Sequence, residues 1–318
     1  MVNFFKRYIS WIAPFVLAAF ILFGLLLVSA PPPLPHEQIV EIAQGMSAPQ
    51  IAQKLFDEHI IAHPFVLRLA LRLSKGSGTV QAGAYRFDTP QNIVVVVYRL
   101  LRGAYGLPPT RITFIEGVTV REAAEQVATA LPGVSAIDFM KEALPYEGYL
   151  FPDTYFFTPS ATAASIVATM RANFTAKIDP FMDDIAVSKH SLSDIVIVAS
   201  LVEKEARTNV NRRIVAGILW NRLALGMPLQ VDAVFGYIFN RDTYSPSAAD
   251  LRVDSPYNTY THIGLPPTSI DNPGVDALDA AIHPTKTNYL YYLTGKDDQM
   301  HYATTYAGHQ FNQRKYLP

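Results

Sequence analysis

The pattern of apolar and polar positions is most distinctive in the segment SLSDIVIVASLVEKEA, residues 191–206. Ser191 followed by Asp194 three residues later is typical of the start of a helix, where the two side chains form a capping box. Apolar residues then recur at helical spacing, and the positions between them are apolar too. A helix that is apolar on every side is buried, so the pattern predicts a central core helix.

This predicted helix ends with two carboxylates, Glu203 and Glu205. At about 100° per residue, each lies about 80° to one side of the main apolar stripe. At least one of them should therefore be partly desolvated, and desolvation raises the pKa of a carboxyl group. A carboxylic acid that stays protonated near neutral pH is what a general acid needs.

The remaining pattern predicts an α+β protein, with a small N-terminal subdomain and a mainly helical domain that carries short strands. The expected organisation is a tail, anchor and stalk at 1–35, a subdomain at 36–106 and a larger domain at 107–318. The predicted strands are 38–43, 80–87, 111–115, 289–293 and 301–303. The other predicted helices are 47–56, 64–73, 89–101, 120–130, 136–143, 164–174, 210–225, 273–282 and 306–317. The segment 147–157, EGYLFPDTYFF, is predicted to be an aromatic loop that packs on the core or lines a cleft.

The N-terminal segment from Tyr8 to Ala30 is uncharged and about long enough to cross a bilayer as a helix. Lys6 and Arg7 precede it, which predicts a cytoplasmic N-terminus and a body outside the membrane. A cleaved signal peptide ending at Ala30 is the alternative, but the apolar run is long for one. The prolines 31–33 would form a short stiff stalk, and a break at 76–78 interrupts the following subdomain.

Composition narrows the chemistry. A formal net charge of −1 gives no electrostatic reason to expect nucleic-acid binding. The chain has no cysteine, which excludes disulfides and thiolate chemistry, and its histidines lack metal-ligand spacing. We therefore expect neither a metal nor another cofactor.

Six segments in one order, spread over about half of the chain, resemble the YceG-like family of endolytic murein transglycosylases. They are EGYLFPDTYFF (147–157), ASLVEKEA (199–206), VAGILWNRLALGMPLQVDAVFGY (215–237), SPYNTYTHIGLPPTSIDNPG (255–274), ALDAAIHPTKTNYLYYL (277–293) and HYATTYAGHQFNQRKYL (301–317). The subdomain at 36–106 is similar to the LysM-like module of that family, most clearly in QAGAYRF and the helix after it.

The resemblance implies a membrane-anchored lytic transglycosylase that cleaves the MurNAc–GlcNAc β-1,4 bond within nascent peptidoglycan strands. One glutamate would protonate the leaving oxygen and then accept the proton of the muramyl C6 hydroxyl, which gives a 1,6-anhydro end. This differs from the usual glycosidase scheme with two carboxylates. The implied role is to limit strand length outside the inner membrane, with peptidoglycan synthases as possible partners.

The resemblance places the catalytic glutamate in the VEKE segment, and we assign it to Glu203, with Glu205 as the second choice. Spacing alone does not separate them. Arg207 follows Glu203 by one helical turn and could pair with it, which would lower the pKa of Glu203 and count against it as the acid.

Candidate substrate-binding residues follow the same segments. Gln230 and Asp232 could bind sugar hydroxyls or cap a turn. Tyr257, Asn258 and Thr259 offer an aromatic face, an amide and a hydroxyl, although a loop Asn more often bonds backbone. Glu147 could bind substrate or fix its loop through backbone N–H groups.

Two other functions remain open. A hydrolytic muramidase would use water in place of the C6 hydroxyl. A non-catalytic peptidoglycan-binding scaffold would use the LysM-like unit and the aromatic loops, but the glutamates of VEKE argue against it.

Overall fold

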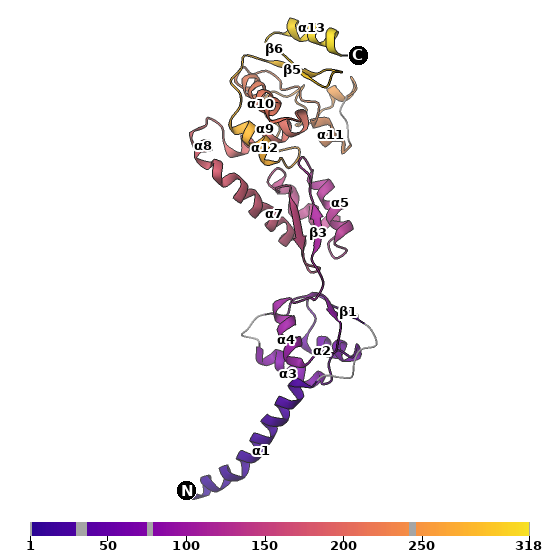
Figure 1. The fold of residues 1–318 in the computed structure, drawn as a ribbon, viewed down its shortest axis with the longest axis vertical. Coiled ribbons are helices and arrows are strands. Elements are labelled where there is room, and N and C mark those ends of the chain that lie inside the picture. Colours follow the sequence, from indigo (N-terminus) through magenta and orange to yellow (C-terminus); the bar gives the residue numbers. More distant parts are fainter. Residues whose placement is uncertain (1, 30–36, 75–78, 242–245, 318) are drawn as a thin grey trace. The chain divides into compact units, whose positions relative to one another are not determined.

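The computed structural model describes residues 2–29, 37–74, 79–241 and 246–317, with side chains from residue 15 onward (Figure 1). The expected proline stalk and the break at 76–78 lie outside the described residues. The chain forms two compact units. Unit 1 comprises Met1–Thr110 with Phe157–Ser160, and unit 2 comprises Arg111–Phe156 with Ala161–Pro318.

Unit 1 is built on one antiparallel pair of strands. Its elements are α1 (Val2–Val28), β1 (Gln38–Ile42), α2 (Ala48–Asp57), α3 (Pro64–Leu73), β2 (Gly83–Phe87) and α4 (Ile93–Arg102). β1 and β2 pair in register from Gln38↔Phe87 to Ile42↔Gly83, with α2 and α3 in the connection between them. α4 begins at the N-cap Asn92, which accepts from the Val95 N–H, and ends at Gly103 in the left-handed region (φ 65°). The side chains that alternate inward from the strands pack with the helices into one apolar core.

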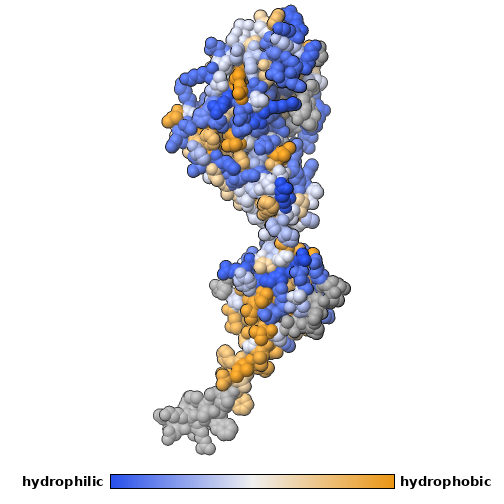
Figure 2. Space-filling view, in the orientation of Figure 1, coloured by the Kyte–Doolittle hydropathy of each residue, from blue (hydrophilic) through white to orange (hydrophobic). Residues whose placement is uncertain are grey.

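The C-terminal part of α1 packs on this core through Phe23, Leu26 and Leu27. Other apolar side chains of α1 are exposed, such as Phe15 and Phe20, and Figure 2 shows them as a hydrophobic surface along the helix. Among the helices whose residues are described, none is by itself both long and apolar enough to cross a membrane. Phe15–Val28 is a shorter apolar helix. Only two helical segments taken together, 163–187 and Leu192–Glu205, are long and apolar enough to span a membrane, and they are sharply bent relative to each other.

The first part of unit 2 joins a two-stranded sheet to four helices. Its elements are β3 (Thr110–Thr113), α5 (Val120–Ala130), α6 (Ala136–Ala143), β4 (Thr154–Phe157), α7 (Ala163–Ile178) and α8 (Met182–Val187). β3 and β4 form the sheet. Short 3₁₀ turns, η2 (Leu144–Tyr146) and η3 (Asp179–Phe181), follow α6 and α7.

The second part of unit 2 surrounds a buried helix, as the sequence pattern predicts. Its elements are α9 (Leu192–Glu205), α10 (Asn209–Ala224), α11 (Val234–Phe239), η4 (Asp250–Arg252), α12 (Val275–Ile282), β5 (Tyr291–Thr294), β6 (Met300–Ala303) and α13 (Tyr306–Tyr316). Every residue of α9 from Ile195 to Val202 is buried, and the predicted Ser191–Asp194 capping box is present. α9 packs against α10 and α12, while the β5–β6 hairpin and α13 lie near the C-terminus (Figure 1).

The structure confirms a mixed α/β architecture of helices and short strands, with local differences from the prediction. The strand expected at 80–87 forms only from Gly83, and the aromatic loop at 147–157 ends in β4. α8 and α11 were not predicted because six residues are too few for a helical repeat to be recognised.

Candidate functional site

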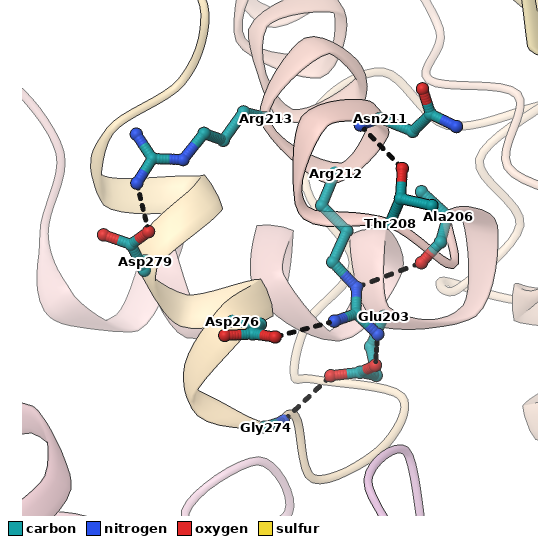
Figure 3. Close-up of polar contacts among 9 residues, drawn as sticks. All are labelled: Glu203, Ala206, Thr208, Asn211, Arg212, Arg213, Gly274, Asp276 and Asp279. Atoms are coloured by element: carbon teal, nitrogen blue, oxygen red, sulfur yellow. Dashed lines mark hydrogen bonds and ion pairs between the residues drawn. The ribbon is translucent and has the colours of Figure 1, made fainter.

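Glu203 lies at the end of α9 with its side chain only 4% exposed. One carboxylate oxygen, Oε1, accepts from the Arg212 guanidinium in the first turns of α10. The other, Oε2, accepts from the N–H of Gly274 at 2.9 Å, and Gly274 is the N-cap of α12. Figure 3 shows the carboxylate held between these two groups. The positive end of a helix dipole and a guanidinium therefore both stabilise the ionised form of Glu203.

Arg212 is itself fixed by other contacts. Its Nε donates to the Ala206 carbonyl at 3.0 Å, and its Nη1 lies 3.6 Å from a carboxylate oxygen of Asp276 (Figure 3). Close packing adds to this arrangement, because a Cβ at Gly274 would lie 2.6 Å from Cγ of Glu116 and 3.4 Å from Oε2 of Glu203. A larger residue at 274 would therefore force the Glu116 side chain to move, while its contact with Glu203 would be an ordinary van der Waals distance.

Burial raises the pKa of Glu203, while the Gly274 N–H and Arg212 oppose that rise. The pairing with Arg207 that the sequence allowed does not form. α9 ends at Glu205, and Ala206 is extended (φ −138°, ψ 135°), so Arg207 leaves the helical face on which it would follow Glu203. Arg212 of the next helix takes that role.

Glu205 has different surroundings, although it is only two residues away. The hydroxyl of Tyr292 on β5 donates to Oε2 at 3.1 Å, and the N–H of Ala233 also bonds the carboxylate. Burial raises the pKa of Glu205 to about 7 and the nearby negative charge of Asp232 adds to the rise, whereas the Tyr292 and Ala233 hydrogen bonds lower it. This carboxyl is thus protonated in a large fraction of molecules at neutral pH.

The loops that carry the candidate binding residues join next to Glu205. The Gln230 N–H donates to the Thr259 carbonyl at 3.1 Å, and the Val231 N–H donates to the Thr259 hydroxyl at 2.9 Å. The Tyr260 hydroxyl donates to Asp232 at 2.5 Å. Burial raises the pKa of Asp232, and the Tyr260 hydrogen bond opposes this. The structure therefore brings Gln230, Asp232 and Thr259 together, with Asp232 near Glu205.

Asn258 supports this loop from inside. It is fully buried, its Nδ2 donates to the carbonyls of Leu251 and Val253 at 3.1 and 2.9 Å, and its Oδ1 accepts from the Tyr260 N–H at 2.9 Å. Both ends of the amide are thus bonded to backbone, which is the structural role considered from the sequence. The hydroxyl of Tyr257 bonds that of Thr268 at 2.7 Å.

Glu147 belongs to a separate buried network. Its side chain accepts from the Val120 N–H at 3.0 Å, at the start of α5, and from Nδ2 of Asn272 at 3.0 Å. Oδ1 of Asn272 in turn accepts from the N–H groups of Gly148 and Leu150, both at 2.9 Å. Burial raises the pKa of Glu147 to about 8. These contacts join α5 to two loops of unit 2, so the geometry gives Glu147 a structural place.

Sequence reasoning missed three residues. Arg212 contacts Glu203 from 9 positions along the chain, and Tyr292 contacts Glu205 from 87 positions along the chain. No local sequence pattern predicts such pairs. Asp271 is fully buried, and neither of its carboxylate oxygens has a hydrogen-bond partner among the described residues. Burial raises its pKa well above the usual range. In the described part of the chain, no group of acidic or histidine side chains is arranged to hold a metal ion.

The arrangement separates two kinds of carboxyl at the end of one helix. Glu203 is a paired, positioned carboxylate. Glu205 is a carboxyl with a pKa of about 7 that lies beside Asp232, the Tyr292 phenol and a partly exposed loop. None of the groups that shift its pKa is basic. A group of this kind can donate a proton to a leaving oxygen and later accept one, which is general acid–base chemistry at neutral pH.

Comparison with known proteins finds similar murein transglycosylases. An endolytic murein transglycosylase of Bacillus subtilis (strain 168) is 29% identical over 305 residues, which cover 87% of this chain and 84% of that protein. One of Streptococcus pneumoniae serotype 2 (strain D39 / NCTC 7466) is 33% identical over 177 residues, 54% of this chain, and the match spans 32% of that longer protein.

A crystal structure of a YceG-like protein from Listeria monocytogenes superimposes with a TM-score of 0.60 at 28% identity, covering 86% of this chain and 98% of that one. The sequence profile of the YceG-like family matches residues 40–315, which include α9, both glutamates and the loops around them. The chain belongs to the YceG-like family.

Proposed function

We propose that this protein is an endolytic murein transglycosylase and that Glu205 is its catalytic acid and base. The observation that carries the proposal is the carboxyl of Glu205, with a pKa of about 7, set beside Asp232 and Tyr292 at the end of a buried helix. The names of the relatives supply the reaction class.

The proposed reaction cleaves the MurNAc–GlcNAc β-1,4 bond without water. The Glu205 carboxyl gives its proton to the glycosidic oxygen as the bond from C1 of MurNAc to that oxygen breaks. The resulting carboxylate then accepts the proton of the muramyl C6 hydroxyl while the C6 oxygen bonds C1. This step closes the 1,6-anhydro ring and restores the acid. Tyr292 orients the carboxyl, and the charge of Asp232 favours its protonated form.

Glu203, the first choice from the sequence, is less suited to this role because Arg212 and the Gly274 N–H occupy both of its oxygens. We propose that it holds α9, α10 and the start of α12 together behind the acid. Substrate contacts are assigned to Gln230, which is exposed, and to Tyr257 and Asp232, which are partly exposed. Asn258 and Thr259 hold the loop in place, and Glu147 fixes the neighbouring fold.

We also propose that α1 anchors the enzyme in the inner membrane, with its body outside. The 27-residue helix and the charges Lys6 and Arg7 before an uncharged segment support this. The rest of unit 1, with two helices between paired strands, is proposed to be the LysM-like module. Peptidoglycan synthases at the membrane are the proposed protein partners.

Mass spectrometry of purified sacculi digested with the protein tests the reaction. We expect internal cleavage with products that end in 1,6-anhydro-MurNAc. Reducing MurNAc ends, which carry the mass of one added water, would instead identify a hydrolytic muramidase. Binding to sacculi without any cleavage would indicate a scaffold and overturn the proposal.

A further inference from the structure

A pocket of about 270 Å³ lies in unit 2 beside the end of α9, between the first turns of α5 and the helix α11. Several of its lining residues lie in the segments that resemble the family, and Tyr237 in its wall contacts Tyr257 of the loop at 257–260, with 5.0 Å between the ring centroids. Five of its lining side chains carry charge: Arg121, Glu122, Glu125, Lys204 and Arg241. Its remaining walls are formed by Thr119, Ala233, Gly236, Tyr237, Asn240 and Ile270.

Two of the five charged side chains already have partners within the protein. Glu122 closes the capping box of α5, where its Oε2 accepts from the Thr119 N–H at 2.8 Å. Arg241 lies 3.2 Å from a carboxylate oxygen of Asp250. These contacts shape the wall of the pocket: Asp250 compensates the charge of Arg241, and the N-terminus of α5 stabilises the carboxylate of Glu122.

The other three charged side chains are not paired with one another or with other charges. Among the described residues, neither Arg121, Lys204 nor Glu125 makes an ion pair. Arg121 lies over the ring of Tyr237, with 5.8 Å from its guanidinium carbon to the ring centroid. Lys204 and Glu125 are exposed. Arg121 acts on the buried acid Glu147 and Lys204 on the buried acid Asp271, and burial raises the pKa of both acids. The pocket therefore presents two cations without an ion pair, and one carboxylate, to a ligand.

The pocket is next to the proposed acid. Ala233 lines the pocket, and its backbone N–H bonds the carboxylate of Glu205. Lys204 stands between the two glutamates in the sequence of α9. In peptidoglycan the stem peptide is attached to the lactyl group of MurNAc, the same sugar whose C1 reacts, so a bound strand must place a peptide close to the acid.

We propose that this pocket binds the stem peptide of the MurNAc unit at the cleavage site. The ligand is a short acidic peptide with free carboxylates and one side-chain amine. Arg121 and Lys204 bind its carboxylates and Glu125 binds its amine, which matches the two cations and one carboxylate that the pocket offers. This inference rests on the proposed function and adds a preference for strands that still carry peptides.

The test compares intact glycan strands with strands whose peptides an amidase has removed. Steady-state cleavage is measured for the wild type and for Lys204→Met, Arg121→Met and Glu125→Gln, with Lys141→Met on the exposed face of α6 as the matched control. Each cation variant should raise KM on intact strands about tenfold, the effect of one charge-assisted hydrogen bond. KM on amidase-treated strands and the behaviour of the control should not change.

Glu125→Gln should weaken cleavage of intact strands but not of strands whose amine has been acetylated. Equal losses on peptide-bearing and peptide-free strands, or no loss on either, would overturn the proposal. Calorimetry measures binding of a synthetic stem pentapeptide to the full chain and does not depend on cleavage. If the wild type binds the peptide and Lys204→Met does not, the pocket assignment stands even where the proposed reaction fails. Absence of binding by the wild type overturns it.

Discussion

Glu203 and Glu205 are two identical side chains, two residues apart on one helix, and the fold gives them different partners, although burial raises the pKa of both. Glu203 lies between a guanidinium and the N-terminus of α12, which both favour its charged form. Glu205 lies beside Asp232 and a phenol, and burial raises its pKa to about 7. The difference arises because α9 ends there, so that residues on its two sides face different neighbours. Proximity in sequence is therefore no guide to which carboxyl carries the proton.

Neutralising each glutamate in turn tests which of the two is the catalytic acid. Glu205→Gln should lower kcat by about 10²–10⁴-fold, the contribution of a positioned acid–base group, with the fold intact. Glu203→Gln should keep kcat within about tenfold of the wild type in the folded fraction. Turnover on sacculi and circular dichroism are measured for both variants. If Glu203→Gln is inactive and Glu205→Gln is active, the assignment is reversed.

The second prediction concerns stability on the Glu203 side. Arg212→Met leaves a carboxylate that is 4% exposed without its cation, and breaking a buried pair costs about 3–5 kcal/mol of unfolding free energy. Arg86→Met removes pairs with Glu37 and Asp88, whose side chains are 51% and 65% exposed, so it should cost only about 0–1 kcal/mol. Urea titrations of the two variants decide this. Equal small losses would mean that Arg212 does not stabilise Glu203.

Much of the fold follows from local sequence, and particular residues show why. The Ser191–Asp194 capping box and the all-round apolar run predicted α9, and both are present. Thr119 and Glu122 cap α5 at the predicted boundary in the same way. Such features depend on residues within one or two turns, which sequence spacing states directly.

The partners in the candidate site could not be predicted, since they depend on the fold as a whole. The pairing expected between Glu203 and Arg207 requires the helix to continue, but Ala206 is extended and the chain turns into α10. Arg212 then approaches Glu203 from the next helix, and Gly274 approaches from 71 positions away. For Asn258 the sequence left sugar binding and backbone bonding open, and the structure shows backbone groups bonded to both ends of its amide.

The pH dependence of the unfolding free energy distinguishes Glu147 from Glu203 and Glu205. Its folded pKa of about 8 lies above its usual value of 4.5, so the folded state binds the proton more tightly than the unfolded state. Stability is then full at low pH and falls as pH rises from 4.5 to about 8. The difference between these two pKa values corresponds to a loss of at most ~5 kcal/mol. Glu147→Gln should flatten this dependence in urea titrations from pH 4.5 to 8. An unchanged pH slope in the variant would contradict the assignment.

The smallest effect is expected from removing the hydrogen bond that Tyr292 donates to Glu205. Cleavage needs the protonated carboxyl, so activity should fall as pH rises through about 7. The Tyr292 hydroxyl stabilises the carboxylate and lowers this pKa against the larger effect of burial. Tyr292→Phe should therefore move the alkaline limb of the kcat profile upward by about 0.5–1 pH unit. Tyr302→Phe removes a hydroxyl that bonds Asn211 instead and should leave the limb in place. A limb that moves equally in both variants, or downward in Tyr292→Phe, would show that the profile does not report the titration of Glu205.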